Sequence, residues 1–169
     1  VNRIEVGAKI LDTRAQVLKK DLEKAGFAGK IKQVWLNDVY TIDKRFSQVD
    51  LEKIASMLVN PIIQRASINR SQIFPDFSWA IEIGFLPGVT DNVANTAKEN
   101  IEDLLKTKFF QEEGVYTSQL IFIKGRLSQR EITLLSNGLI NPIIQRVRFK
   151  DKLQYEKEKG MERLFLRLN

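Results

Sequence analysis

The chain has 169 residues, of which 43% are hydrophobic and 28% charged, with a net charge of +6 and neither cysteine nor histidine. It can therefore build no disulfide, no thiolate nucleophile, no cysteine-ligated metal site and no histidine general base, which argues against a self-contained hydrolase or amidotransferase. The small positive charge, the lack of an apolar run of roughly 20 residues and the lack of a secretory signal predict a cytoplasmic domain that binds neither nucleic acid nor membrane.

The residue pattern in the first part of the chain predicts two units, each made of strand and helix. Apolar residues alternate with polar ones over the first ten residues, at Ile4, Val6, Ala8 and Ile10, which indicates a half-buried strand. A helix follows, with Asp12 as its N-cap and Gly26 at its end. Residues 31–36 and 39–42 are predicted as two strands joined by a turn at Asn37-Asp38. Ser47 begins a second helix, and a closing strand covers residues 62–68.

The same order returns in the second part. The hexapeptide Asn60-Pro61-Ile62-Ile63-Gln64-Arg65 recurs letter for letter at residues 141–146. Strands are expected at residues 79–85, 115–123 and 143–149, and helices after Asp91 and Ser128. In both copies the Asn-Pro step ends the second helix, because the residue before a proline is disfavoured in helical conformation.

Duplication defines the predicted domains. Residues 1–68 form repeat 1, residues 69–78 a linker, and residues 79–150 repeat 2. Residues 151–169 are first charged and then apolar, and we expect a docking helix or a connector into further protein.

The predicted fold class is α+β. Each repeat reads βαββαβ, the order of ferredoxin-like sandwiches, with both helices on one face of its sheet. The other face would stay exposed, so we expect the repeats to cover each other as a pseudo-two-fold internal dimer of antiparallel sheets and helices.

Neither a glycine-rich phosphate loop nor a cluster of metal ligands is recognisable, so we predict no catalytic, cofactor-binding or metal residues. Two features point to a partner interface instead. One is the apolar loop before the Asp91 cap, which turn and cap chemistry alone could also explain. The other is the repeated hexapeptide, in which helix termination and strand propensity leave the identical Gln-Arg unexplained. The candidate interface residues are Pro87, Gly88, Asp91, Asn92, Asn60, Pro61, Arg65, Asn141, Pro142 and Arg146.

Several segments of both repeats resemble PurS, the small subunit of phosphoribosylformylglycinamidine (FGAM) synthase. In repeat 1 the resemblance rests on Leu11-Asp12, Gly26-Phe27 and residues 58–63. In repeat 2, residues 84–92 and 139–142 are similar to the PurS-like N-terminal region of single-chain versions of the enzyme. The resemblance covers residues 1 to about 150, although repeat 1 lacks the Pro-Gly turn and the hairpin of repeat 2 is shorter.

The resemblance implies a non-catalytic module of a ligase in purine biosynthesis. The family enzyme amidates formylglycinamide ribonucleotide with ATP and glutamine-derived ammonia. PurS units dimerise and brace the PurQ-type glutaminase against the PurL-type synthetase, which is the part that uses ATP and Mg²⁺. The two repeats would correspond to the two subunits of a PurS dimer, and residues 161–168 would lead into a synthetase domain.

Two questions stay open at this point. One is whether the chain associates with further copies of itself. The other is an alternative function, a ferredoxin-like regulatory domain that binds a small metabolite between its two copies.

Overall fold

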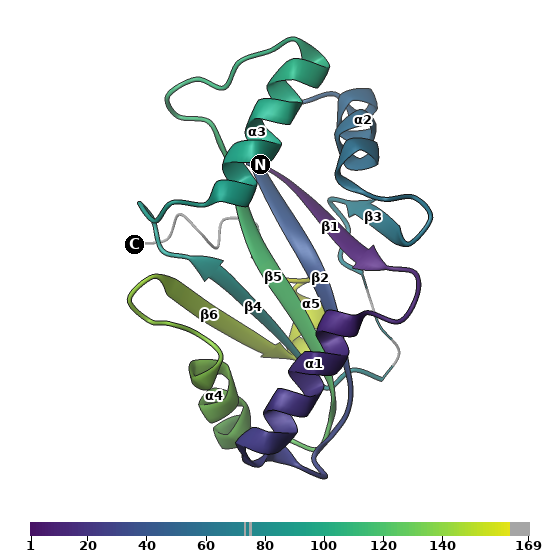
Figure 1. The fold of residues 1–169 in the computed structure, drawn as a ribbon, viewed down its shortest axis with the longest axis vertical. Helices are drawn as coiled ribbons and strands as arrows, with labels where there is room; N and C mark the ends of the chain where they lie inside the picture. The colour runs from purple at the N-terminus through teal and green to yellow at the C-terminus, as the bar shows by residue number, and fades with distance from the viewer. Residues whose placement is uncertain (73, 75, 163–169) are drawn as a thin grey trace.

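The computed structural model describes residues 1–72, 74 and 76–162, which form an α+β fold around one antiparallel sheet (Figure 1). The first half contains β1 (Asn2–Ala8), α1 (Thr13–Leu22), a π-helical turn η1 (Glu23–Phe27), β2 (Ile31–Asp43), α2 (Gln48–Leu58) and β3 (Gln64–Ile68). The second contains β4 (Trp79–Phe85), α3 (Asn92–Leu105), β5 (Gly114–Gly125), α4 (Gln129–Gly138), β6 (Gln145–Asp151) and α5 (Lys152–Lys157). The six strands lie in the order β3-β1-β2-β5-β4-β6.

Each half has the order βαβαβ, so the predicted βαββαβ order is wrong. The expected turn at Asn37-Asp38 lies inside the continuous strand β2. Strands pair on both sides of it there, because Asn37 stands opposite Gly7 of β1 and Leu120 of β5. Pairing along both edges outweighs the turn tendency of an Asn-Asp step that has no glycine.

The two halves have the same strand register. Gly7 stands opposite Asn37 of β2 and Arg65 of β3, and Gly84 stands opposite Ser118 of β5 and Arg146 of β6. The joint between the halves is the pairing of β2 with β5, which runs from Ile31 to Asp43. One continuous sheet therefore passes through both halves.

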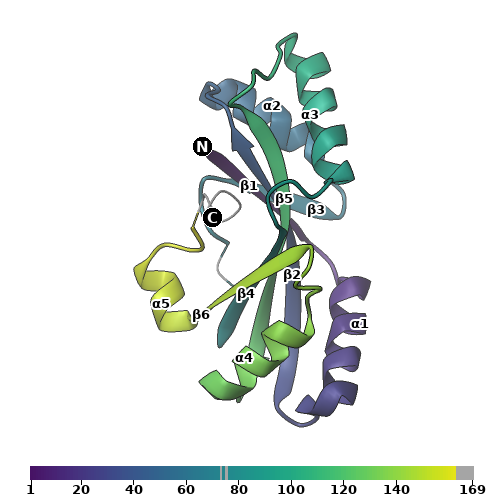
Figure 2. The same cartoon turned by 90° about the vertical axis from the view of Figure 1, so that its left-hand side faces the viewer.

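Two hydrophobic cores lie under the helices on one face of the sheet. Figure 2 shows α1 and α3 on this side. One core combines Ala15 and Leu22 of α1 with Ile132 and Leu135 of α4. The other combines α2 with α3. Each core thus takes one helix from each half.

A third cluster covers part of the opposite face, where α5 lies (Figure 2). It packs Phe77 of the connecting segment and Tyr155 of α5 against Phe122 of β5, with ring centroids 5.1–5.5 Å apart. The expectation that the repeats cover each other's open sheet faces is therefore wrong. They join edge to edge, and the connecting segment and α5 lie on the open face instead.

Several local predictions are confirmed. Asp12, Ser47, Asp91 and Ser128 are all N-caps whose side chains accept a backbone hydrogen bond. Gly26 ends the first helical segment at φ +109°, in the left-handed region. Ile10, predicted in the first strand, lies beyond β1 and is 62% exposed.

The ends of the predicted domains fall near element boundaries, since β3 ends at Ile68 and β4 begins at Trp79. Of the predicted tail, residues 163–169 lie outside the described part. In the described part of the chain, no helix has the length and apolar character needed to cross a membrane.

Candidate partner interface

The repeated hexapeptide forms the same turn in both halves. The Asn60 carbonyl accepts hydrogen bonds from the N–H groups of Ile63 (3.1 Å) and Gln64 (2.7 Å). The Asn60 side-chain oxygen accepts from the N–H of Ile62 at 3.1 Å. The Gln64 side chain returns to accept from the Asn60 N–H at 2.9 Å. Residues 141–145 repeat all four bonds, so the turn itself accounts for the identical asparagine and glutamine.

Each turn is fixed to the loop that leads into the first helix of its own half. The Lys9 N–H donates to the Ile63 carbonyl at 2.8 Å, and Lys9 Nζ donates to the Pro61 carbonyl at 2.6 Å. In the second half, the Leu86 N–H donates to the Ile144 carbonyl at 2.8 Å. The turn at Asn141-Pro142 is thereby brought beside the Pro87-Gly88 loop.

Pro87 and Gly88 are exposed in a tight turn. The Val89 N–H donates to the Leu86 carbonyl at 3.2 Å, which closes the turn. Gly88 has φ +85°, a conformation that strains residues with a Cβ atom. Turn geometry thus explains the glycine, whereas the exposed proline ring is available for contact with another protein.

Asp91 holds α3 onto β5. Its Oδ1 accepts from the Ala94 N–H at 2.9 Å, as an N-cap does. Its Oδ2 accepts from the N–H (2.9 Å) and the hydroxyl (2.7 Å) of Thr117. Both oxygens are used inside the chain, so Asp91 has a structural role. Asn92, the first residue of α3, is exposed.

Arg65 and Arg146 occupy equivalent positions near the starts of β3 and β6. These are the two edge strands, so the arginines and their turns lie at opposite edges of the sheet (Figure 1). The structure brings Pro87, Gly88 and Asn92 into the same half as Asn141, Pro142 and Arg146. It does not bring them together with Asn60, Pro61 and Arg65, so the candidate interface residues form two separate groups.

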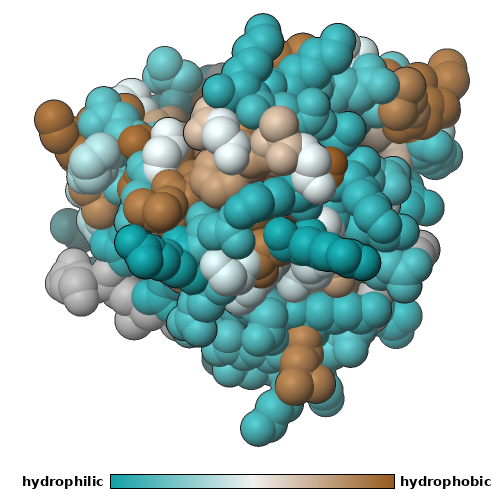
Figure 3. All heavy atoms as spheres, turned by 90° about the horizontal axis from the view of Figure 1, so that it is seen from below, coloured by the Kyte–Doolittle hydropathy of each residue, from teal (hydrophilic) through white to brown (hydrophobic). Residues whose placement is uncertain are grey.

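Apolar side chains are exposed around both turns. Ile62 and Ile143 at the turn tips are 82% and 81% exposed, and Ile10 and Leu11 beside the first turn are 62% and 74% exposed. Seen from below, the end of the molecule is mostly hydrophilic, with hydrophobic side chains at its rim and an area of hydrophobic and neutral side chains near its centre (Figure 3). Each turn therefore carries exposed apolar side chains that another protein could contact.

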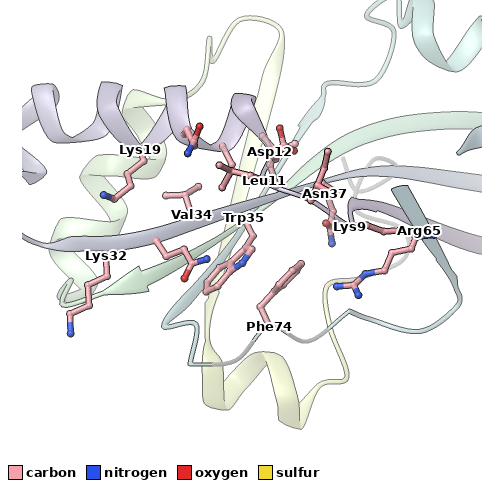
Figure 4. A pocket seen from close by; sticks show the side chains of 16 residues that line it. Lys9, Leu11, Asp12, Lys19, Lys32, Val34, Trp35, Asn37, Arg65 and Phe74 are labelled. Carbon is pink, nitrogen blue, oxygen red and sulfur yellow. The ribbon is translucent and has the colours of Figure 1, made fainter. Parts of the chain in front are cut away.

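A hollow of about 610 Å³ lies beside β2, between α1, the end of β1 and the connecting segment. Arg65 is the candidate interface residue that lines it. Figure 4 shows Lys19 and Lys32 at one end of this hollow and Lys9 and Arg65 at the other. No local sequence pattern indicates the hollow, because the lining residues come from four separate segments.

A second hollow, of about 440 Å³, lies where the two halves meet. Its lining includes Asp38 and Tyr40 from β2 and Thr117 and Gln119 from β5. Arg14 of α1 also lines it and donates two hydrogen bonds to the Asp38 carboxylate, at 3.0 and 3.2 Å. These bonds to Asp38 raise the pKa of Arg14, and burial raises the pKa of Tyr40.

A charged cluster is buried on the sheet face opposite the two-helix cores. Arg3 donates from Nε to Glu5 at 3.0 Å and from Nη1 to Glu82 at 2.8 Å, and the Ser118 hydroxyl also donates to Glu82 at 2.6 Å. Burial raises the pKa of Glu5 although Arg3 opposes that shift. Burial disfavours the charged form of Arg3, but the two carboxylates outweigh it and raise the pKa of the guanidinium.

Among the described residues, no group of three or more acidic side chains is arranged to hold a metal ion. No family model matches the chain, and no curated protein matches it either.

Proposed function

We propose that the chain is a non-catalytic assembly module of FGAM synthase. Its two PurS-like halves would form an internal pseudo-dimer in place of two PurS subunits. They would brace a PurQ-type glutaminase against a PurL-type synthetase domain, so that ammonia reaches the synthetase protected from water.

The observation that carries this proposal is the register between the halves. Asp38 stands opposite Gln119 in the β2–β5 pair, and these are equivalent positions when the two copies of the hexapeptide are aligned. In a two-fold dimer, equivalent residues of the two subunits meet at the symmetry axis. A pairing of equivalent positions at the centre of the sheet supports a fused pair of similar units.

The exposed turns support a bracing role. Two like turns with isoleucine tips lie at opposite sheet edges, where they could contact two different proteins at once. The Pro87-Gly88 loop beside the second turn belongs to residues 84–92, one of the segments that resemble the family.

Reconstitution tests this function. The purified chain is mixed with a matching synthetase and glutaminase, and FGAM formation is measured with glutamine and, separately, with ammonium chloride. We expect the chain to increase the glutamine-dependent rate and to leave the ammonium-dependent rate nearly unchanged. Equal glutamine-dependent rates with and without the chain would overturn the proposal.

A second candidate is a regulatory domain that binds a small metabolite between its halves. The hollow of about 440 Å³ favours it, because polar groups of both halves converge there. Calorimetry against amino acids and nucleotides distinguishes the two functions. Saturable heat that disappears in an Arg14→Ala variant supports the regulatory function, and no heat with any of them argues against it.

A further inference from the structure

Part of β2 has a strand neighbour on only one side in the described part of the chain. β2 is 13 residues long and pairs with β5 to its first residue, whereas its register with β1 ends at the Gly7–Asn37 pair. The pairing ends one residue before the end of the seven-residue strand β1, so residues 31–36 are not paired with a residue of β1. We call the side of residues 31–36 that faces away from β5 the outer edge of β2.

The direction of the backbone groups at this edge follows from bonds made by β5. The Thr117 N–H donates to Asp91, and the Ile123 carbonyl accepts from the Ser78 N–H. The backbone N–H and C=O groups of the odd-numbered residues of β5 therefore point towards β4. When two residues stand directly opposite each other in an antiparallel pair, their backbone N–H and C=O groups point either both towards the partner strand or both away from it. Val34 stands opposite Ile123, so the N–H and C=O of Val34 point to the outer edge.

The second half protects the corresponding position. Thr117 is the counterpart of Leu36 when the two hexapeptides are aligned, and Asp91 caps the Thr117 N–H at 2.9 Å. In the first half the helix cap is Asp12, whose Oδ1 accepts from the Arg14 N–H instead. No described side chain caps Leu36 in the way that Asp91 caps Thr117. The two halves therefore differ at this point, where the first half leaves a strand edge unpaired within the described part of the chain.

The hollow of about 610 Å³ runs along this edge. All residues from 32 to 37 line it, which means that it meets the edge of the strand rather than one face of the sheet. The ring of Trp35 lies against Phe74 with centroids 5.2 Å apart, and Figure 4 shows both rings between the basic groups at either end. The hollow thus offers backbone groups and an aromatic surface together.

The charges around the hollow are mostly positive. Lys9, Lys19, Lys32 and Arg65 line it, against one acidic residue, Asp12. Lys19 pairs with Glu23 outside the lining at 3.0 Å. In the described part of the chain, neither Lys32 nor Arg65 has an acidic side chain within ion-pair distance. Negative charge on a ligand would therefore be favoured at both ends of the hollow.

We propose that the outer edge of β2 binds an extended, acidic peptide segment of a partner protein, which adds to the sheet as a further strand beside residues 32–36. Unpaired strand edges accept added strands through backbone hydrogen bonds, and side-chain contacts then select the sequence. Here Lys32 and Arg65 select for acidic side chains. The inference rests on the sheet edge and its charges and does not depend on the proposed function.

Binding of a defined probe tests the proposal. The probe is a blocked eight-residue peptide of alternating glutamate and valine, added to the whole chain. Amide hydrogen exchange, followed by NMR, reports on the Val34 N–H. We expect saturable binding and exchange at Val34 slowed at least about tenfold, because the amide gains a partner. The same peptide with N-methyl groups on alternate amides along one edge should not protect Val34.

Charge variants complete the test. The double variant Lys32→Glu with Arg65→Glu should bind the acidic peptide at least about tenfold more weakly. The matched control, Lys53→Glu with Arg130→Glu, makes the same change of net charge at exposed helix positions and should bind nearly as the wild type does. Unfolding curves of both variants show that the folds are intact.

Four results would overturn the proposal. They are no binding of the acidic peptide, equal binding of the N-methylated peptide, equal binding of a lysine–valine peptide, and protection of Val34 in the chain alone through self-association seen by sedimentation. The last result would assign the edge to a second copy of the chain.

Discussion

Arg3 of β1 donates a hydrogen bond to Glu82 of β4 at 2.8 Å, although β2 and β5 lie between these two strands. Glu82 is the counterpart of Glu5 in the repeated strand pattern, and Arg3 binds both carboxylates. One guanidinium thus links corresponding positions of the two halves across the centre of the sheet. The three side chains are at most 6% exposed.

Removing this arginine should destabilise the whole fold. Arg3→Met leaves two buried carboxylates without their cation, and the expected loss is about 3–5 kcal/mol of unfolding free energy. Urea unfolding measures it, with Lys53→Met on the exposed side of α2 as the control for loss of one charge. A loss below about 1 kcal/mol, the size expected of an exposed ion pair, would show that the cluster does not hold the halves together.

The raised pKa of Glu5 predicts a pH dependence. A carboxyl group whose pKa in the folded state lies above its ordinary value of about 4.5 holds its proton more tightly when folded. It therefore favours folding at low pH, and this contribution is lost as the pH rises through the folded-state pKa. Relative to the wild type, Glu5→Gln should become more stable as the pH rises from about 4 to 7.

Glu131 provides a control of opposite sign. Its hydrogen bond with Lys30 lowers the pKa of its carboxyl group, so its contribution is present at neutral pH and lost as the pH falls. Glu131→Gln should therefore become less stable relative to the wild type over the same rise. Urea unfolding at several pH values measures both differences, and equal slopes for the two variants would contradict the assignment.

The two helix caps should differ in strength. Asp91→Ala removes the cap of α3 and both bonds to Thr117, whereas Asp12→Ala removes the cap of α1. An N-cap contributes about 0.5–2 kcal/mol, and the extra bonds should add about 1 kcal/mol to the loss at Asp91. Thermal unfolding of the two variants measures both losses of stability. An equal or larger loss for Asp12→Ala would contradict the prediction.

The repeated turns should contribute independently. Gln64→Ala and Gln145→Ala each remove one side-chain hydrogen bond to the start of a turn, at a cost of about 1 kcal/mol. Because the turns lie at opposite sheet edges, the double variant should lose the sum of the two. Denaturant unfolding measures all three variants. A coupling above about 0.5 kcal/mol, the margin within which distant sites add, would mean that the turns interact.

Pro87→Ala and Arg146→Ala are expected to weaken assembly with the synthetase and glutaminase more than they weaken folding. Pro87 is exposed in its turn, so its loss should change the unfolding free energy by about 0.5 kcal/mol or less. Assembly is followed by sedimentation of the mixed proteins, and stability by thermal unfolding. Parallel losses of binding and of stability would assign both residues a structural role instead.

Local patterns in the sequence predicted most elements correctly. The caps at Asp12, Ser47, Asp91 and Ser128 and the glycine end at Gly26 depend on a few neighbouring residues, so they can be inferred without the rest of the fold. The prediction of a turn at Asn37-Asp38 was wrong because it depends on distant parts of the chain. Strands from distant parts of the chain pair on both sides of it, and no local pattern contains that information.

The buried charges and the hollow were missed for physical reasons. Glu5 and Glu82 occupy alternate positions of their strands, which usually face solvent, but here that sheet face is buried and Arg3, which has no counterpart in the second half, binds both carboxylates. The hollow results from unequal lengths of two neighbouring strands, β1 and β2. Of the candidate interface residues, sequence reasoning placed Arg65 on the surface but could not show that it lines this hollow.

The sharing of helices between cores has a mechanical consequence. Because α1 and α4 contribute to one core and α2 and α3 to the other, a rotation of one half against the other would open both cores and the β2–β5 ladder. Under the proposed function, these shared cores would hold the two turns, and the proteins bound to them, at a fixed spacing on opposite edges of the sheet.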